Sequence, residues 1–184
     1  LPIYASRDFA VVGPLGVVPS VLLASPAKGF KTAADLVNAA KAKPGSLNFA
    51  SAGVGTATHL SAVRFNVSAG IEAVHVPFKS APEILGEMLA GRIDYFLAPI
   101  VVALPFVRDG KLVALAVNSP RRLKSLPDVP TLSEAGFANA EYSFWIGVFL
   151  PAKTPGEIVE RLAQEMHKAL AESKVRDKLA ALGV

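Results

Sequence analysis

Short apolar runs and longer amphipathic runs alternate along the middle of the chain. The apolar runs predict strands at residues 47–50, 72–76, 93–97 and 111–117. The amphipathic runs beside them predict helices at residues 32–43, 57–69, 80–91 and 99–107. Because strands and helices take turns, we expect an α/β protein with a mostly parallel sheet and helices on both faces.

The two ends of the chain depart from this alternation. Residues 9–12 and 16–24 have an extended pattern, and residues 142–150 form an apolar, aromatic run that predicts a buried strand. Two amphipathic helical patterns close the chain, the first starting near Thr154. These segments have no strand–helix–strand partners nearby. They are therefore expected to be the two ends of a second domain whose remainder precedes Leu1.

Composition narrows the class of protein. Of the 184 residues, 52% are hydrophobic and 18% are charged, which favours a packed core over disorder. No apolar run reaches the roughly 18–20 residues of a membrane span. The net charge of +4 is scattered, and the one tight basic cluster lies at residues 121–124. Nucleic-acid binding is therefore not expected.

Cysteine and histidine usage bears on metal and redox chemistry. The chain has no cysteine, which excludes disulfides, thiolate metal sites and a cysteine nucleophile. Its three histidines, His59, His75 and His167, have no metal-ligand spacing. We expect neither a metal nor a cofactor. His75 lies in an apolar strand and is interpreted as a structural histidine, whereas His59 fits a structural or a ligand-binding role equally well.

The stretch Ser51-Ala-Gly-Val-Gly-Thr-Ala-Thr-His59 joins a predicted strand to a predicted helix. Gly53 and Gly55 permit a tight turn that exposes backbone amides, and Thr56 can cap the helix. A helix start is electropositive, so a small carboxylate could bind there. A purely steric need for glycine explains the same pattern.

Two further turns are expected at the same edge of the sheet. Ligands of open α/β sheets bind beyond the carboxyl ends of the strands. The Pro77–Ser80 turn, which contains Phe78 and Lys79, and the turn at residues 97–99 both follow predicted strands. Their convergence with the glycine turn favours a binding site there. Phe144 and Trp145 are interpreted as core residues or as part of a cleft wall.

Catalytic and nucleotide-binding motifs do not fit these residues. A nucleophile elbow places serine between two glycines, whereas Ser51 precedes both. The glycine turn lacks the Gly-Lys-Ser/Thr of a P-loop and the third glycine of a dinucleotide fingerprint. Glu83 and Glu87 lie one helical turn apart, but Glu83 is expected to serve as a helix cap.

Five stretches, taken in order, resemble the substrate-binding proteins of tripartite tricarboxylate transporters, the Bug receptor family. The first is Leu47-Asn-Phe-Ala-Ser-Ala-Gly-Val-Gly-Thr-Ala-Thr-His59. The others are Val74-His-Val-Pro-Phe-Lys79, Gly110-Lys-Leu-Val-Ala-Leu-Ala-Val117, Leu126-Pro-Asp-Val-Pro-Thr-Leu-Ser-Glu-Ala-Gly136, and Phe144-Trp-Ile-Gly147 followed by Pro151-Ala-Lys-Thr-Pro155. The resemblance covers nearly the whole chain, and the ordered set is more specific than any single piece.

The resemblance implies a periplasmic solute-binding protein of the type II periplasmic-binding-protein fold. Such proteins have two α/β lobes and hold a small carboxylate in the cleft between them for membrane transporter subunits. Residues 24–145 would then be a complete second lobe, and residues 1–23 and 146–184 remnants of an incomplete first lobe. The ligand-binding residues implied are Ser51, Ala52, Gly53, Gly55, Thr56, His59, Phe78, Lys79, Ser80, Ala98 and Pro99.

Departures from the family pattern qualify these expectations. The family usually has Tyr-Lys-Gly where this chain has Phe78-Lys79-Ser80, and many members have Asp-Asn in place of Ala98-Pro99. A cleft without that acid is expected to suit a plain or apolar acid better than an amino acid. With half of the clamp absent, we expect this chain to bind carboxylates weakly or not at all, and its open edges to favour self-association.

Two other functions remain open from the sequence. The first is a two-lobed effector-sensing module of a regulator, which a DNA-binding segment or membrane helix outside these residues would favour. The second is a small-acid enzyme of the same architecture. It would need a titrating residue at the glycine turn, and only His59 is available there. We expect a binding protein and no catalysis.

Overall fold

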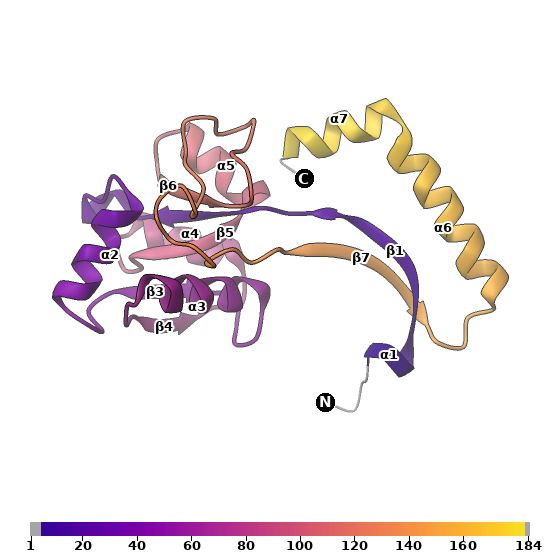
Figure 1. Cartoon of the computed structure of the whole chain (residues 1–184), viewed down its shortest axis with the longest axis horizontal. Helices are drawn as coiled ribbons and strands as arrows, with labels where there is room; N and C mark the ends of the chain where they lie inside the picture. The colour runs from indigo at the N-terminus through magenta and orange to yellow at the C-terminus, as the bar shows by residue number, and fades with distance from the viewer. Residues whose placement is uncertain (1–4, 183–184) are drawn as a thin grey trace. The chain divides into compact units, whose positions relative to one another are not determined.

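The computed structural model describes residues 5–182 of the chain, which fall into two compact units. Unit 1 combines residues up to 18 with residues 145–182, and unit 2 comprises residues 19–144. Figure 1 labels most of the elements of both.

A five-stranded sheet forms the centre of unit 2. Its strand order is β4-β3-β5-β2-β6, and the bounds are β2 (Ser20–Ala24), β3 (Asn48–Ser51), β4 (Val74–Pro77), β5 (Tyr95–Pro99) and β6 (Val113–Asn118). Strand β3 pairs in parallel with β4 and β5, whereas β2 runs antiparallel to both of its neighbours, β5 and β6. Four strands therefore point the same way, and the expected mostly parallel α/β sheet is confirmed, with β2 as the reversed strand.

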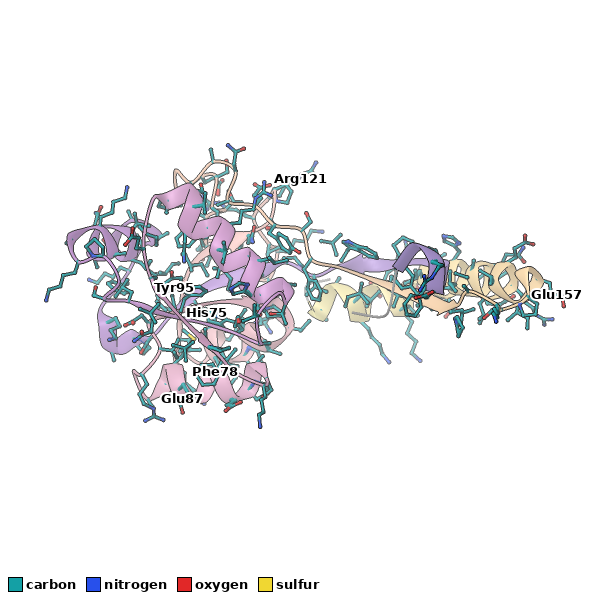
Figure 2. The ribbon with its side chains drawn as sticks, turned by 90° about the horizontal axis from the view of Figure 1, so that it is seen from below. His75, Phe78, Glu87, Tyr95, Arg121 and Glu157 are labelled. Atoms are coloured by element: carbon teal, nitrogen blue, oxygen red, sulfur yellow. The ribbon has the colours of Figure 1, made fainter. Side chains whose placement is uncertain are left out.

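Helices cover both faces of this sheet. They are the short 3-10 helix η1 (Pro26–Lys28) and the helices α2 (Ala33–Ala42), α3 (Ala57–Ala69), α4 (Ala81–Leu89) and α5 (Ile100–Arg108). Figure 2 shows α3 on one side of the sheet and α4, the helix of Glu87, on the other. Buried side chains of α2 and α3, including Leu36 and Phe65, pack with Phe49, Tyr95 and Leu97 of the strands. Because side chains alternate along a strand, the intervening residues face α4 and α5.

Strand β2 shifts the expected boundary between the two parts of the chain. Residues 20–23 were expected to belong to an incomplete first lobe. Instead, all five residues of β2 are buried, and the strand lies between β5 and β6 in the sheet of unit 2. The boundary therefore falls between Val18 and Pro19, and the later boundary lies one residue earlier than expected, before Trp145.

Unit 1 is a two-stranded ribbon with helices. It contains α1 (Ala5–Asp8), β1 (Phe9–Val17), β7 (Trp145–Pro151), α6 (Gly156–Ala171) and α7 (Ser173–Leu182). Strands β1 and β7 are antiparallel, and α6 contacts β1. An apolar groove of about 340 Å³ between the ribbon and the helices is lined by Leu15, Ile146, Met166 and Leu170, among others. No side chain of α6 is buried, so unit 1 has little core of its own among the described residues.

Candidate functional site

Three turns meet at the carboxyl edge of the unit 2 sheet. Strand β3 ends at Ser51 directly beside Pro77, the last residue of β4, and β5 lies on the other side of β3. The backbone N–H of Phe78 donates to the carbonyl oxygen of Ser51 at 2.8 Å, which joins the glycine turn to the Pro77–Ser80 turn. The residues expected to converge from the sequence are thus placed at one edge.

Glycine at two positions shapes the turn between β3 and α3. Gly53 has φ +115° and Gly55 has φ +80°, values that side chains rarely allow. The Thr56 hydroxyl donates to the carbonyl oxygen of Gly53 at 2.7 Å and accepts the backbone N–H of His59 at 3.4 Å, so it caps α3. Ala52 N–H donates to Thr58 Oγ1 at 3.0 Å. The turn is therefore held by its own hydroxyl groups.

The glycine turn and the start of α3 present backbone donors that no acceptor in the described part of the chain uses. Among residues 5–182, no acceptor contacts the backbone N–H groups of Val54, Ala57 or Thr58. The first N–H groups of a helix have no intrahelical partner, and they carry the positive end of the helix dipole. Backbone N–H groups of this kind can donate hydrogen bonds to an anion such as a carboxylate.

A small hollow opens beside Ala57 and Thr58. Its volume is about 10 Å³, near the lower limit for one water molecule. Its exposed surface is almost wholly apolar, although four of the lining residues carry hydroxyl groups, and no charged side chain lines it. The lining residues are Ser20, Ala57, Thr58, Ser61, Leu97, Pro99, Tyr142 and Phe144. Buried Asn118 supports it, since its Nδ2 donates to Ser61 Oγ at 2.7 Å and its Oδ1 accepts Tyr142 N–H at 3.0 Å.

The site residues expected from the sequence fall into distinct positions. Pro99 lines the hollow, whereas none of the residues from Ala52 to Thr56 does; this turn leads through the cap Thr56 into α3, whose first two residues line it. Ser51 and Ala98 are fully buried, so their side chains do not face solvent. Phe78, Lys79 and Ser80 lie in the neighbouring turn and are not among the residues lining the hollow.

Sequence reasoning missed five polar residues at this edge: Ser20, Thr58, Ser61, Asn118 and Tyr142. A signal existed for two of them. Thr58 and Ser61 are three residues apart on one helix, directly after the cap, and so share a face. Asn118 ends an apolar strand, but nothing local indicates that it reaches Ser61, 57 residues earlier.

Two histidines stand behind the glycine turn. His59 Nδ1 accepts the backbone N–H of Gly55 at 3.4 Å. His75 Nε2 lies 2.6 Å from Ser51 Oγ, and the centroids of the two imidazole rings are 4.3 Å apart. Burial, followed by the charge of nearby His59, lowers the pKa of His75. The pair therefore favours the neutral state of His75.

The Ser51–His75 contact is not built as a catalytic dyad. A nucleophile must reach its substrate, but Ser51 has no exposed surface and its Oγ also contacts the backbone of Gly53. In the part of the chain that the structure describes, no Asp or Glu side chain bonds to His75. The same residues contain no group of three His, Cys, Asp or Glu side chains placed to hold a metal ion.

Comparison with known proteins decides the family. The model of the tripartite tricarboxylate transporter family receptor matches residues 1–184. The chain belongs to this receptor family. A relative from Pseudomonas sp. strain P51, a protein encoded in the tcbD-tcbE intergenic region, is 36% identical over 185 residues, covering 100% of this chain and 55% of the relative. The chain thus spans about half the length of that relative.

Solved structures share the fold of this receptor chain. "R. palustris Rpa4515 with adipate" matches 98% of the chain and 60% of its own length, with 28% identity and a TM-score of 0.93. "MatC (Rpa3494) from Rhodopseudomonas palustris with bound malate" matches 100% and 62%, with 32% identity and a TM-score of 0.90. The fold is that of periplasmic binding proteins, as the resemblance implied. Within residues 5–182, no helix combines the length and apolar character needed to cross a bilayer.

Proposed function

We propose that this receptor chain takes part in capturing a small carboxylate from the periplasm and presenting it to the membrane subunits of a tripartite tricarboxylate-type transporter. The proposal includes the two-lobed cleft, with unit 1 as part of the first lobe and unit 2 as the second. The chain performs no catalysis. Self-association of the isolated chain through unit 1 is also part of the proposal.

One observation carries this function. The backbone N–H groups of Val54, Ala57 and Thr58 have no acceptor among residues 5–182, and Ala57 and Thr58 line the hollow at the start of α3. Backbone N–H groups at a helix start suit an anion. The chain belongs to the tripartite tricarboxylate transporter receptor family, and similar solved structures contain adipate and malate. A regulator module of the same fold is the alternative, and no observation in the described residues favours it.

The lining of the hollow supports a preference for plain acids. Its exposed surface is almost wholly apolar, with Leu97, Pro99 and Phe144 among the lining residues, and it contains no carboxylate that could pair with an ammonium group. Glutarate should therefore bind more tightly than glutamate, which differs by one amino group. Calorimetry or NMR titration with both acids measures this, and much tighter binding of glutamate would contradict it.

The carboxylate site is tested by NMR titration of the ¹⁵N-labelled chain with adipate. We expect shifts of the amide signals of Gly53, Val54, Gly55, Ala57 and Thr58, with a dissociation constant on the order of millimolar or weaker, because closure of two lobes normally excludes water and completes the contacts. Adipamide, which lacks the charges, should cause no such shifts. Shifts confined to other surfaces, or none at the turn, would overturn the proposal.

A pair of matched variants separates binding from stability. Ala57→Asp places a negative charge at the turn, whereas Ala34→Asp places one in the first turn of α2. An acid near a helix start is compatible with both helices. We expect Ala57→Asp to abolish the adipate shifts and Ala34→Asp to leave them unchanged. Equal behaviour of the two variants would exclude the start of α3 as the site.

A further inference from the structure

His75 has no role in the binding edge described above, yet it contacts the glycine turn. It lies on the edge strand β4, partly buried, in a shallow groove of about 510 Å³. Its ring stacks on Phe49 with centroids 4.9 Å apart and lies against His59. The titratable side chains that line this groove with it are His59 and Glu72. Its Nε2 contacts Ser51 Oγ, the first side chain of the glycine turn.

The contacts of Ser51 assign a hydrogen to His75. Ser51 Oγ lies 3.1 Å from the carbonyl oxygen of Gly53, 3.2 Å from its backbone nitrogen and 2.6 Å from His75 Nε2. A hydroxyl donates one hydrogen bond and accepts two. The carbonyl can only accept and the backbone N–H can only donate. All three contacts are satisfied together only when His75 Nε2 carries the hydrogen and donates to Ser51.

This arrangement acts on the Gly53 carbonyl oxygen. Besides the Ser51 hydroxyl, the Thr56 hydroxyl donates to it at 2.7 Å and the Thr56 backbone N–H at 3.3 Å. A carbonyl oxygen engaged in this way is held within the turn. If the Ser51 hydrogen pointed to His75 instead, one of these donors would be lost. With one donor fewer, the peptide group of Gly53 rotates more easily. Its partially negative oxygen can then turn toward an incoming acid, which weakens anion binding.

We infer that His75 is a positioning residue of the carboxylate site: as the Nε2–H tautomer it donates to Ser51, which turns the Ser51 hydroxyl onto the Gly53 carbonyl oxygen and fixes the glycine turn for an acid. This inference rests on the proposed function, since it assumes that the turn binds a carboxylate. His75 itself touches no ligand. It acts through Ser51.

The tautomer of His75 is the first test, and it needs no ligand. Long-range ¹H–¹⁵N spectra of the full chain at pH above the histidine titration distinguish Nε2–H from Nδ1–H imidazole. We expect His75 to be the Nε2–H tautomer and to lose this fixed state in Ser51→Ala. His167, an exposed histidine of α6, is the internal control and should not respond to Ser51→Ala. An Nδ1–H tautomer, or no response of His75 to Ser51→Ala, would overturn the inference.

Adipate titration of variants is the second test. His75→Phe keeps a ring but removes the donor, and we expect adipate binding to weaken by about threefold to tenfold, the range of one hydrogen bond. His75→Gln supplies an N–H near the position of Nε2 and should restore binding. His75→Phe should cause no further loss in a chain that already carries Ser51→Ala, because both act on one contact. His167→Phe is the matched control and should bind adipate as the unaltered chain does.

The outcomes separate this inference from the proposed function. Unchanged affinity in His75→Phe, or additive losses in the double variant, would reject the role of His75 while leaving the carboxylate site intact. Absence of adipate shifts in the unaltered chain would reject the proposed function, and the tautomer spectra would then still decide whether His75 donates to Ser51. Free energies of unfolding measured in parallel identify any loss that follows from misfolding.

Discussion

At the scale of single residues, the ion pair of Lys28 and Asp94 is the clearest case of a buried charge. The Asp94 side chain is 1% exposed, its Oδ1 lies 2.7 Å from Lys28 Nζ, and its Oδ2 accepts the backbone N–H of Asn48 at 2.6 Å. The pair joins η1 to the residue before β5, and the second oxygen of Asp94 holds the start of β3. Removing one partner of a buried pair leaves the other charge without compensation.

We therefore expect Lys28→Met to lower the free energy of unfolding by roughly 2–3 kcal/mol, less than for a fully buried pair because Lys28 is partly exposed. Urea denaturation followed by circular dichroism measures the change. Lys111→Met is the matched control, since the Lys111–Asp109 pair is 57% exposed on both sides and should contribute little. Equal destabilisation by the two variants would contradict the importance of burial.

What the sequence predicts at this scale depends on how local the contact is. The φ values of Gly53 and Gly55 and the cap at Thr56 follow from residues adjacent in the chain, and each is found as expected. The inward orientation of Ser51 was not foreseen, because it depends on His75, 24 residues later. Asp94 likewise appears in the sequence as one more charged residue, and only its distant partners explain its burial.

At the scale of elements, two helices begin with the same sequence pattern but different caps. Thr32 and Asp35 form a reciprocal capping box at the start of α2. The similar pattern at Ser80 and Glu83 was expected to cap α4, but the Ser80 side chain makes no cap bond and Glu83 Oε2 accepts the N–H of Lys79 instead. The motif therefore marks both helix starts but specifies the contacts of only one.

This difference predicts different costs for the same kind of substitution. Thr32→Ala removes a side-chain acceptor from the first turn of α2 and should destabilise unit 2 by about 1 kcal/mol. Ser80→Ala removes no cap bond and should change stability by only a few tenths of that amount. Both residues are exposed in the same unit, so chemical denaturation compares them directly. A loss in Ser80→Ala as large as that in Thr32→Ala would show that Ser80 caps α4 in solution.

Strand order is the feature of the elements that the pattern did not reveal. The alternation of strands and helices predicted the four parallel strands, because each crossover is local in the chain. The insertion of β2 between β5 and β6 depends on pairing with residues more than 70 positions away, such as Leu22 with Leu97. The continuous apolar run of β2 predicts a strand, but it does not indicate which sheet the strand joins.

At the scale of the whole molecule, unit 1 exposes an apolar surface that no other described residue of the unit covers. Strands β1 and β7 contain no charged residue. Val11 pairs with Phe149 and Val17 with Trp145, so these four side chains share one face of the ribbon. They remain 65%, 43%, 54% and 55% exposed, respectively. About 40% of the length of the solved adipate complex lies outside the region that this chain matches.

An uncharged apolar face with open strand edges favours pairing with a second copy, because no like charges oppose it. We expect the isolated chain to dimerise as its concentration rises, and Trp145→Lys or Phe149→Lys to shift it toward the monomer. Val67→Lys, at a side chain of α3 that is 77% exposed in unit 2, is the matched control and should leave the dimer intact. Sedimentation velocity measures the oligomeric state.

Trp145 is the one tryptophan of the sequence, so its fluorescence should move to shorter wavelength on association. A chain that stays monomeric at every concentration, or a dimer lost equally in Val67→Lys, would contradict pairing through this face.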